Sequence, residues 1–302
     1  MEKILEKIIH DNRDLINKGH VADYIPALSK VNPNYIGLSI ADIDGNIYNV
    51  GDCNVKFTIQ SISKIIALML ALIDNGEDFL FTKVGYEPTD EPFNTLYKLD
   101  FNKNKPANPM INSGAIVTTS LIKGSKEEKF SRLIELIRFI TENPDINYNE
   151  EVYLSEKSTG HKNRAMAYLM KSKGLLNGDV EDILDTYFKQ CSIEVTAADL
   201  AKIGLFLARR CPMNIDSKIG NERMASIITA IMTTCGMYDF SGQYAATVGI
   251  PSKSGVGGGI LGLIPSKLGI GVFSPALDKF GNSIAGYGIM KDLSRELNLN
   301  IF

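Results

Sequence analysis

Short β-like segments at both ends of this chain enclose a long central stretch whose patterning is helical. A hairpin signal, Asp44-Gly45, separates the first two segments, and a helical pattern from about residue 283 to 297 follows the last. The β-like segments span about residues 35–41, 46–50, 260–264 and 268–273. The simplest architecture that joins both ends in one sheet is an α/β (α+β) domain with a helical domain inserted into it.

Between residues 62 and 235 the apolar positions recur mostly at helical spacing. Residues 1–17 show the same spacing, whereas the polar, proline-bearing stretch 85–109 is typical of long loops. The central amphipathic helices are expected at about 130–140, 164–170, 183–188, 197–207 and 224–232. One catalytic unit over 1–302 is expected, with an α/β subdomain from about 1–60 and 236–302 and a helical subdomain from about 61–235.

Composition and charge argue against several classes of protein. A net charge of −3 without any basic cluster argues against a nucleic-acid binder. The first ten residues are charged throughout and lack the apolar stretch of a signal peptide, and no run is long enough to span a membrane. The four cysteines form no C-x-x-C pair, which favours reduced thiols in a cytoplasmic protein.

The segment Ser61-Ile-Ser-Lys64 stands where an extended stretch, residues 56–59, gives way to the apolar run 65–73. If that run is a helix, Ser61 lies in its first turn and Lys64 lies one turn later on the same face. The N-terminus of a helix also points backbone N–H groups at whatever lies beside the serine. A hydroxyl, an amine that can take its proton and donors for an oxyanion are the requirements of a serine acyl-transferase.

Histidine chemistry is poorly supported, because the chain contains only His10, His20 and His161. No H-E-x-x-H or paired His/Cys spacing indicates a metal site. A Ser-His-Asp triad would have to use His161, and no G-x-S-x-G elbow accompanies it. A hydrolase with this sequence must work without histidine, which a Ser–Lys pair allows.

A second motif, Lys253-Ser254-Gly255, begins a glycine-rich stretch that precedes β-like sequence. Residues 257–262 match G-x-G-x-x-G, but they continue into a strand rather than opening a helix, which argues against a dinucleotide site. In the β-lactamase and penicillin-binding superfamily an S-x-x-K near the start of a helix is joined by a K-[ST]-G strand late in the chain. Lys253-Ser254-Gly255 lies in that order relative to Ser61, so an edge strand carrying this box is expected.

Several further segments resemble those of the serine-dependent glutaminases, in the family's order and over nearly the whole chain from about Val21. This resemblance implies a serine β-lactamase and DD-peptidase-like fold, an antiparallel sheet flanked by terminal helices with an inserted helical domain. It also implies hydrolysis of L-glutamine to L-glutamate and ammonia by an amidohydrolase that acts on a linear amide. The matching segments are 21–28, 57–64, 108–116, 155–156, 163–165, 187–192 and 254–261.

The resemblance implies a catalytic role for four side chains. Ser61 would be the nucleophile, and Lys64 could act as its base if burial and a second cation keep the amine largely neutral. Lys253 is a candidate for that second cation. Tyr187 matches the family tyrosine that passes the proton among Ser61, Lys64 and the leaving ammonia. Whether Lys64 or Tyr187 takes the first proton is left open by the sequence.

The resemblance also implies the substrate contacts. The backbone N–H groups of Ser61 and Val256 would hold the oxyanion. Glu156 fits the position that pairs the α-ammonium of the substrate. Positions that donate or accept neutral hydrogen bonds are matched by Tyr24, Asn112, Asn163, Tyr187 and Tyr238. No cofactor and no metal are implied, and the expected partners are L-glutamine and further copies of the chain in a homodimer or homotetramer.

Two other interpretations compete with this one. A penicillin-recognising peptidase or β-lactamase would share the fold and the Ser–Lys chemistry. Such enzymes need an export signal and carry an S-x-N or Y-x-N box, whereas residues 187–190 read Tyr-Phe-Lys-Gln. A non-catalytic glutamine sensor is the other alternative, and retention of Ser61 together with Lys64, Tyr187 and Lys253 argues against it.

Overall fold

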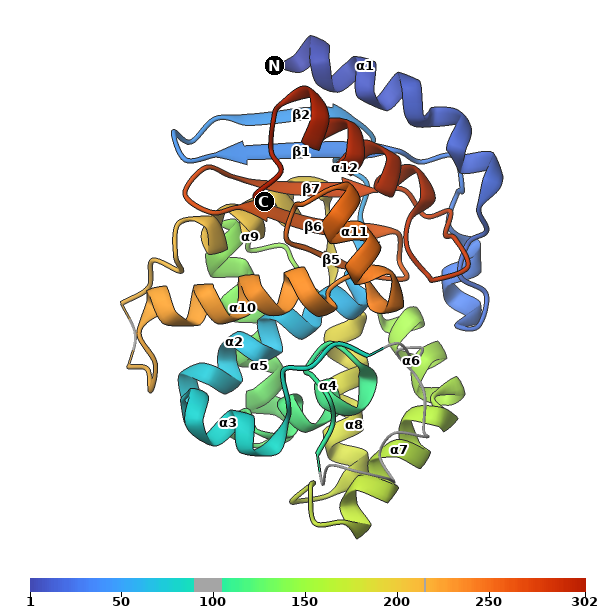
Figure 1. Cartoon of the computed structure of the whole chain (residues 1–302). Helices are drawn as coiled ribbons and strands as arrows, with labels where there is room; N and C mark the ends of the chain where they lie inside the picture. Colours follow the sequence, from blue (N-terminus) through green and yellow to red (C-terminus); the bar gives the residue numbers. More distant parts are fainter. Residues whose placement is uncertain (90–104, 215) are drawn as a thin grey trace.

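Five antiparallel strands from the two ends of the chain form the main sheet (Figure 1). The computed structural model describes residues 1–89, 105–214 and 216–302. The strands lie in the order β2-β1-β7-β6-β5, so the N-terminal hairpin pairs with β7 near the C-terminus, with Gly37 opposite Phe273. The strands are β1 (Gly37–Asp42), β2 (Ile47–Gly51), β5 (Ser252–Ser254), β6 (Gly259–Ile264) and β7 (Leu268–Phe273). The hairpin around Asp44-Gly45 and the edge position of Lys253-Ser254 are as the sequence predicts.

Helices cover both faces of this sheet. On one face, α1 (Glu2–Asn12) and α12 (Ile284–Glu296) pack together over the sheet (Figure 1). On the other face lies α9 (Ala197–Ala208). Strands β6 and β7 have apolar residues on both faces because both faces are covered, and every residue in them is buried.

The close approach of α9 to the sheet depends on glycines in β7. A Cβ atom at Gly269 would come within 2.0 Å of the Leu205 nitrogen, and one at Gly271 within 1.9 Å of the Ala197 oxygen. Because β side chains alternate between faces, these glycines face α9 while Ile270 and Val272 face α1 and α12. The helix backbone therefore rests almost directly on the strand.

The central stretch forms a helical block below the sheet (Figure 1). Its middle is α2, whose residues 63–73 are all buried, as expected for a helix that is apolar on every side. The helices are α2 (Ser63–Asn75), α3 (Glu77–Lys83), α4 (Asn112–Ser120), α5 (Lys126–Thr141), α6 (Glu150–Thr159), α7 (His161–Ser172), α8 (Val180–Cys191) and α10 (Asn221–Cys235). Helix α11 (Ser241–Thr247) follows this stretch and packs in the same apolar cluster as α1 and α12.

Short elements connect these parts. Strands β3 (Phe57–Thr58) and β4 (Glu194–Val195) pair with each other beneath the main sheet. The 3₁₀ turns are η1 (Arg13–Lys18), η2 (Pro26–Lys30), η3 (Gln60–Ile62) and η5 (Tyr238–Phe240). The helix predicted over residues 1–17 is α-helical only to Asn12 and continues as η1.

All five predicted central helices are present, and each is longer than its apolar core suggested. The predicted division into an α/β and a helical subdomain stays a prediction, and α9 from the central stretch packs on the sheet. Of the predicted long loop at 85–109, residues 90–104 lie outside the described part of the chain. No helix among the described residues combines the length and the apolar character needed to cross a membrane, and the cytoplasmic location stays a prediction.

Candidate active site

Ser61 lies at the junction between β3 and α2, inside the 3₁₀ turn η3. The prediction that Ser61 occupies the first turn of the α-helix is therefore wrong by one short turn, because α2 begins at Ser63. Gln60, directly before the serine, is buried and has a φ of 48°, in the left-handed region. A non-glycine residue held there is strained, and such strain is often found at functional sites.

A cavity of about 420 Å³ opens beside Ser61. It collects residues from segments that are distant in sequence: the stretch before η2, η3, α4, α6, α7, α8 and the turn before β6. Seven predicted site residues line it, namely Tyr24, Ser61, Asn112, Glu156, Asn163, Tyr187 and Val256. Tyr24 is 54% exposed, whereas Ser61 is 7% exposed, so the tyrosine lies nearer the solvent.

Lys64 is fully buried behind the wall of this cavity. Its Nζ donates hydrogen bonds to the Met110 carbonyl at 2.9 Å and to Asn112 Oδ1 at 2.7 Å. Burial lowers the pKa of Lys64 to about 8, although nearby Cys191 and Glu156 act in the opposite direction. A neutral amine has two N–H groups for these two acceptors, which leaves its lone pair free to accept a proton.

Asn112 connects this amine to the substrate-facing wall. It is the first residue of α4, and its Nδ2 donates to Asn163 Oδ1 on α7 at 3.0 Å. This bond orients the Asn112 amide so that its oxygen faces Lys64. The two asparagines that the sequence predicts as substrate contacts are thus directly linked.

Glu156 places a buried carboxyl group in the cavity wall. The residue is 7% exposed, and its Oε2 has no hydrogen-bond partner among the described residues. Burial raises the pKa of Glu156 to about 8, against the opposing influence of Lys64 and a hydrogen bond with Gln60. An unpaired buried carboxyl oxygen beside a cavity is suited to bind a cation that enters it.

Tyr187 and Cys191 face the same cavity from successive turns of α8. Burial raises the pKa of Tyr187 well above its usual value, so the phenol stays protonated. Burial likewise raises the pKa of Cys191, whose Sγ lies 4.0 Å from the Ser63 hydroxyl. Cys191 is therefore a neutral thiol and not a competing nucleophile.

Lys253 and Tyr238 form a second layer behind Ser61. The Lys253 Nζ donates to the carbonyls of Gly236 at 3.0 Å and Ser254 at 2.5 Å, and it lies 4.3 Å from the centre of the Tyr238 ring. Burial, followed by the charge of Lys64, lowers the pKa of Lys253 well below its usual value. The Tyr238 hydroxyl donates to the Ser254 carbonyl at 3.2 Å and is also hydrogen-bonded to Ser61.

The glycine-rich turn after Ser254 lies against the strand that leads to Ser61. A Cβ atom at Gly255 would come within 2.7 Å of the Ile59 carbonyl, and one at Gly257 within 2.3 Å of the Thr58 carbonyl. These glycines bring Val256 to the cavity beside Ser61. The G-x-G-x-x-G match is explained by this turn and by β6, as the sequence analysis anticipated.

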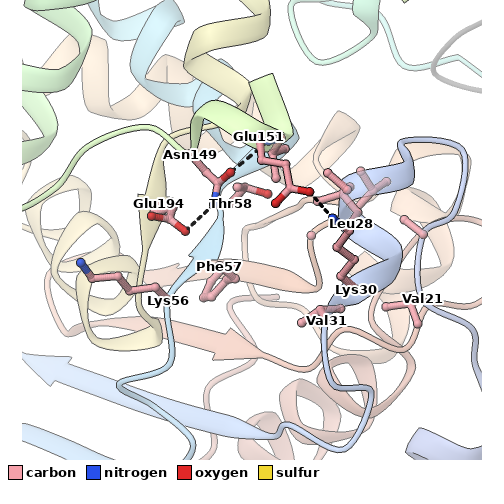
Figure 2. Close-up of a pocket in the computed structure, with 15 residues that line it drawn as sticks. Val21, Leu28, Lys30, Val31, Lys56, Phe57, Thr58, Asn149, Glu151 and Glu194 are labelled. Carbon is pink, nitrogen blue, oxygen red and sulfur yellow. Dashed lines mark hydrogen bonds and ion pairs between the residues drawn. The ribbon is translucent and has the colours of Figure 1, made fainter. Parts of the chain in front are cut away.

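A second cavity, of about 240 Å³, shares Val256 of its lining with the first (Figure 2). Apolar residues such as Leu28 and Phe57 line it, and an ion pair between Lys30 and Glu151 lies at its side (Figure 2). Of the predicted site residues only Val256 reaches it. The larger cavity, which contains the candidate nucleophile, is therefore the candidate active site.

Several residues that line the larger cavity were not predicted from the sequence. Gln60 could have been suspected because it directly precedes Ser61, and Cys191 because it follows Tyr187 by one helical turn. Of the others, Ile25 precedes η2, and four residues come from the junction between α6 and α7, where no motif of the sequence indicated a site. These four are Thr159, Gly160, His161 and Lys162.

Comparisons with known proteins agree with this geometry. The glutaminase family model matches residues 19–302. Glutaminase 2 of Clostridium perfringens is 54% identical over 306 residues, which covers 100% of both chains. The crystal structure of a probable glutaminase of Bacillus subtilis is 38% identical, with a TM-score of 0.91, and the match covers 100% of this chain and 97% of that one.

A further structure is the covalent complex between a Bacillus subtilis glutaminase and 5-oxo-L-norleucine, formed by reaction with 6-diazo-5-oxo-L-norleucine. It is 38% identical to this chain, with a TM-score of 0.89 and coverage of 100% of this chain and 99% of that one. These matches confirm the predicted β-lactamase-like fold class and the predicted amidohydrolase activity. On this agreement of sequence, fold and relatives, the chain belongs to the glutaminase family.

Proposed function

We propose that this chain hydrolyses the γ-carboxamide of L-glutamine through an acyl-enzyme on Ser61. The observation that carries this proposal is the placement of Ser61 and an unpaired buried carboxyl group at one cavity, with a buried lysine of lowered pKa behind its wall. The covalent complex of the Bacillus subtilis relative with 5-oxo-L-norleucine, which has a glutamine-like skeleton, supports covalent chemistry in the family.

In the acylation step, neutral Lys64 takes the hydroxyl proton of Ser61 as Oγ attacks the amide carbon. The backbone N–H groups of Ser61 and Val256 stabilise the oxyanion, each contributing about 3 kcal/mol in comparable sites. Tyr187 then donates its proton to the leaving nitrogen and is reprotonated by Lys64, so that ammonia departs and Lys64 is neutral again. Water attacks the resulting ester while Lys64 takes one of its protons. Lys64 returns that proton to Ser61 Oγ as the ester bond breaks, which releases L-glutamate and restores Ser61 and Lys64. No cofactor or metal takes part in these steps.

The assignment of Lys64 as first base is supported by opposite pKa shifts. The pKa of Lys64 is lowered toward neutrality, whereas the pKa of Tyr187 is raised, which suits the phenol to donate and relay protons. Burial, and not a charge on Lys253, is the main cause of the lowered pKa of Lys64. Burial also lowers the pKa of Lys253 well below its usual value, and this residue acts through its hydrogen bond to the Ser254 carbonyl and its contact with Tyr238.

The α-ammonium of glutamine binds Glu156, whose Oε2 is otherwise unpaired. Tyr24, Asn112 and Asn163, which line the cavity, supply neutral hydrogen bonds to the rest of the substrate. Tyr238 does not line the cavity and instead holds Ser61 and the Ser254 carbonyl. A site of this kind rejects analogues that lack a group, because its own polar atoms would be left without partners.

Substitution of Glu156 by glutamine is expected to raise the KM for L-glutamine about 10- to 100-fold while changing kcat much less. The variant retains the shape of the side chain but loses the charge that pairs with the ammonium. Steady-state ammonia release over a range of glutamine concentrations measures both constants. An unchanged KM would remove Glu156 from the ammonium site.

The activity should rise steeply with pH up to about pH 8, because two groups must lose protons. Lys64 acts as a base only when neutral, and Glu156 attracts the ammonium only when charged, and both have a pKa of about 8. A logarithmic plot of kcat/KM against pH is therefore expected to approach a slope of two below pH 8 in the wild type. In the Glu156→Gln variant the slope should be one, since one of the two protons is no longer involved. A slope of one in both proteins would contradict the requirement that Lys64 and Glu156 both lose a proton.

The first test is ammonia release from L-glutamine by the purified chain, with L-asparagine as second substrate. Release from glutamine supports the proposal, whereas binding of glutamine without release would favour a sensor. Hydrolysis of a penicillin or a D-alanyl peptide instead would favour the peptidase interpretation. Assembly into a homodimer or homotetramer is proposed from the family resemblance, and light scattering of the purified chain tests it.

A further inference from the structure

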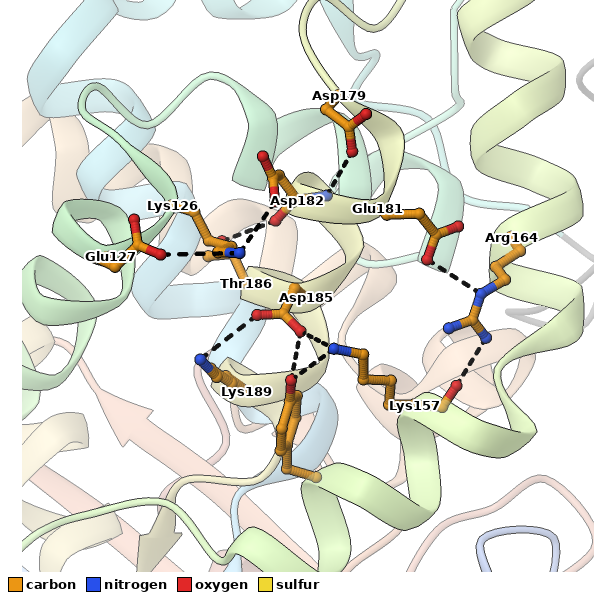
Figure 3. A network of polar contacts seen from close by, with 11 residues as sticks. Lys126, Glu127, Lys157, Arg164, Asp179, Glu181, Asp182, Asp185, Thr186 and Lys189 are labelled. Carbon is orange, nitrogen blue, oxygen red and sulfur yellow. Dashed lines mark hydrogen bonds and ion pairs between the residues drawn. The ribbon is translucent and has the colours of Figure 1, made fainter.

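Three of the helices that carry substrate-facing residues are tied together by a polar network (Figure 3). Glu156 lies on α6, Asn163 on α7 and Tyr187 on α8. The network is centred on Asp185, which lies two residues before Tyr187 and is 6% exposed. Figure 3 shows the amines of Lys157 and Lys189 directed at the Asp185 carboxylate.

Asp185 accepts hydrogen bonds from two residues of α6. The Tyr153 hydroxyl donates to Asp185 Oδ1, and Lys157 Nζ donates to the same oxygen at 2.5 Å. Lys157 Nζ also lies 2.9 Å from the Tyr153 hydroxyl, so the three groups form a closed triangle. Lys189, one turn further along α8, pairs with Asp185 Oδ2 at 3.4 Å.

The two α6 anchors flank Glu156 in the sequence. Tyr153 precedes it by three residues and Lys157 follows it directly, so the anchors and the carboxyl group share one short stretch of helix. Asp185 therefore connects the backbone that carries Glu156 to the backbone that carries Tyr187. Movement of α6 away from α8 would break all contacts of the triangle with Asp185 at once.

A second tie holds α7 in the same assembly. Arg164, next to Asn163, donates to the Lys157 carbonyl at 2.7 Å and lies 5.6 Å from the centre of the Phe188 ring (Figure 3). At the junction between α6 and α7, a Cβ atom at Gly160 would come within 2.6 Å of Phe188. The junction is thus packed tightly against α8.

We propose that Asp185 is a positioning residue that fixes the ammonium-binding carboxyl group of Glu156 at a set distance from Tyr187 and Ser61. This inference rests on the proposed function, in which Glu156 pairs the α-ammonium of glutamine. Asp185 does not line the cavity, so it acts on Glu156 through its contacts with Tyr153 and Lys157 of α6. Its contribution is selective, because the affinity for ligands with an α-ammonium depends on Asp185 and the affinity for ligands without one does not.

The chemistry of the network suits this task. The Asp185 carboxylate is buried and accepts charge-assisted bonds, which are shorter and stronger than neutral ones. Burial acts to raise the pKa of Asp185, but Lys157 and Tyr153 outweigh it and hold the pKa below its usual value. The group thus stays charged and keeps its partners throughout the pH range in which the enzyme would work.

The test compares two product-like inhibitors that differ only in the ammonium group, L-glutamate and glutarate. Their competitive inhibition constants are measured against glutamine hydrolysis by wild type, Asp185→Asn and Tyr153→Phe. Asp182→Asn is the matched control, because Asp182 lies one turn away on α8 and pairs with Lys126 of α5 at the surface. Thermal unfolding confirms that each variant is folded at the assay temperature.

The expected result is that Asp185→Asn raises the inhibition constant of L-glutamate about 10- to 100-fold, since displacement of a binding group by about 1 Å has effects of this size. The inhibition constant of glutarate should stay within about twofold of the wild-type value, so the enzyme would no longer prefer the inhibitor that carries an ammonium group. Tyr153→Phe should show the same selective loss to a smaller degree, and it decides the question if Asp185→Asn does not fold. Asp182→Asn should keep the wild-type preference.

Glu156→Gln separates this inference from the proposed function. If Glu156→Gln loses the preference for L-glutamate while the folded Asp185 and Tyr153 variants keep it, the positioning role is refuted and the ammonium site stands. If Glu156→Gln itself keeps the preference, the ammonium assignment fails and the inference fails with it. Equal weakening of both inhibitors in Asp185→Asn would indicate a general structural role and would also overturn the proposal.

Discussion

Substitution of Ser61 by alanine is expected to lower kcat for L-glutamine about a millionfold, the scale seen when a serine nucleophile is removed from a hydrolase. In the proposed mechanism the Ser61 hydroxyl forms the acyl-enzyme, so its loss leaves oxyanion stabilisation without covalent catalysis. Binding should change little, because the backbone N–H of residue 61 and the contacts of Glu156 remain. Ammonia release measures the first effect, and calorimetric titration with L-glutamine measures the second.

The matched control is Ser63→Ala, which alters a second buried hydroxyl in the same segment. Ser63 does not line the cavity, and its hydroxyl lies 4.0 Å from the Cys191 thiol, so activity within a few-fold of wild type is expected. Treatment with 6-diazo-5-oxo-L-norleucine gives an independent readout by mass spectrometry. The wild type and Ser63→Ala should gain a covalent adduct, and Ser61→Ala should not. An adduct on Ser61→Ala would sink the nucleophile assignment.

The fold could be predicted from the sequence wherever a local pattern of residues by itself determines the element that forms. Asp44-Gly45 is a local turn signal, and the helix α2 is apolar on all sides, so both were identified from the sequence. The pairing of β1 with β7 joins residues more than two hundred positions apart. The β-like segments at both chain ends indicated a shared sheet, but they did not indicate which strands pair or in what register. The resting of α9 on Gly269 and Gly271 was not predicted, because glycines in a strand pattern do not reveal which helix approaches them.

The site could be predicted only as a set of residue types in order. The sequence does not reveal that Asn112 bridges Lys64 and Asn163, since hydrogen bonds between α2, α4 and α7 depend on tertiary packing. The lowered pKa of Lys64 similarly follows from burial on every side and not from its neighbours in sequence. Helix α6, which carries Glu156, was missed because its mixed polar surface gives a weak apolar period.

Substitution of Lys64 by methionine is expected to lower kcat about ten-thousandfold, the upper range for loss of a positioned general base. Methionine fills a similar buried volume without a titratable group, so the packing of α2 is largely retained. It leaves the Met110 carbonyl and Asn112 Oδ1 without their donor, and some loss of stability is therefore expected as well. Thermal unfolding measures that loss separately from the kinetics.

A change of substrate distinguishes the role of Lys64 from that of Tyr187. Hydrolysis of L-glutamate γ-methyl ester still requires activation of Ser61, but its alkoxide leaving group needs far less help from an acid than an amide nitrogen does. If Lys64 is the first base, Lys64→Met should lose activity on the ester as well as on glutamine.

The expected result for Tyr187 differs. If Tyr187 protonates the leaving nitrogen, the kcat of Tyr187→Phe should fall about a hundredfold or more on glutamine and much less on the ester. The opposite pattern, with the ester sensitive to Tyr187→Phe and insensitive to Lys64→Met, would assign the first proton transfer to the tyrosine. The raised pKa of Tyr187 and the lowered pKa of Lys64 favour the first pattern, because only the lysine has an appreciable unprotonated fraction near neutral pH.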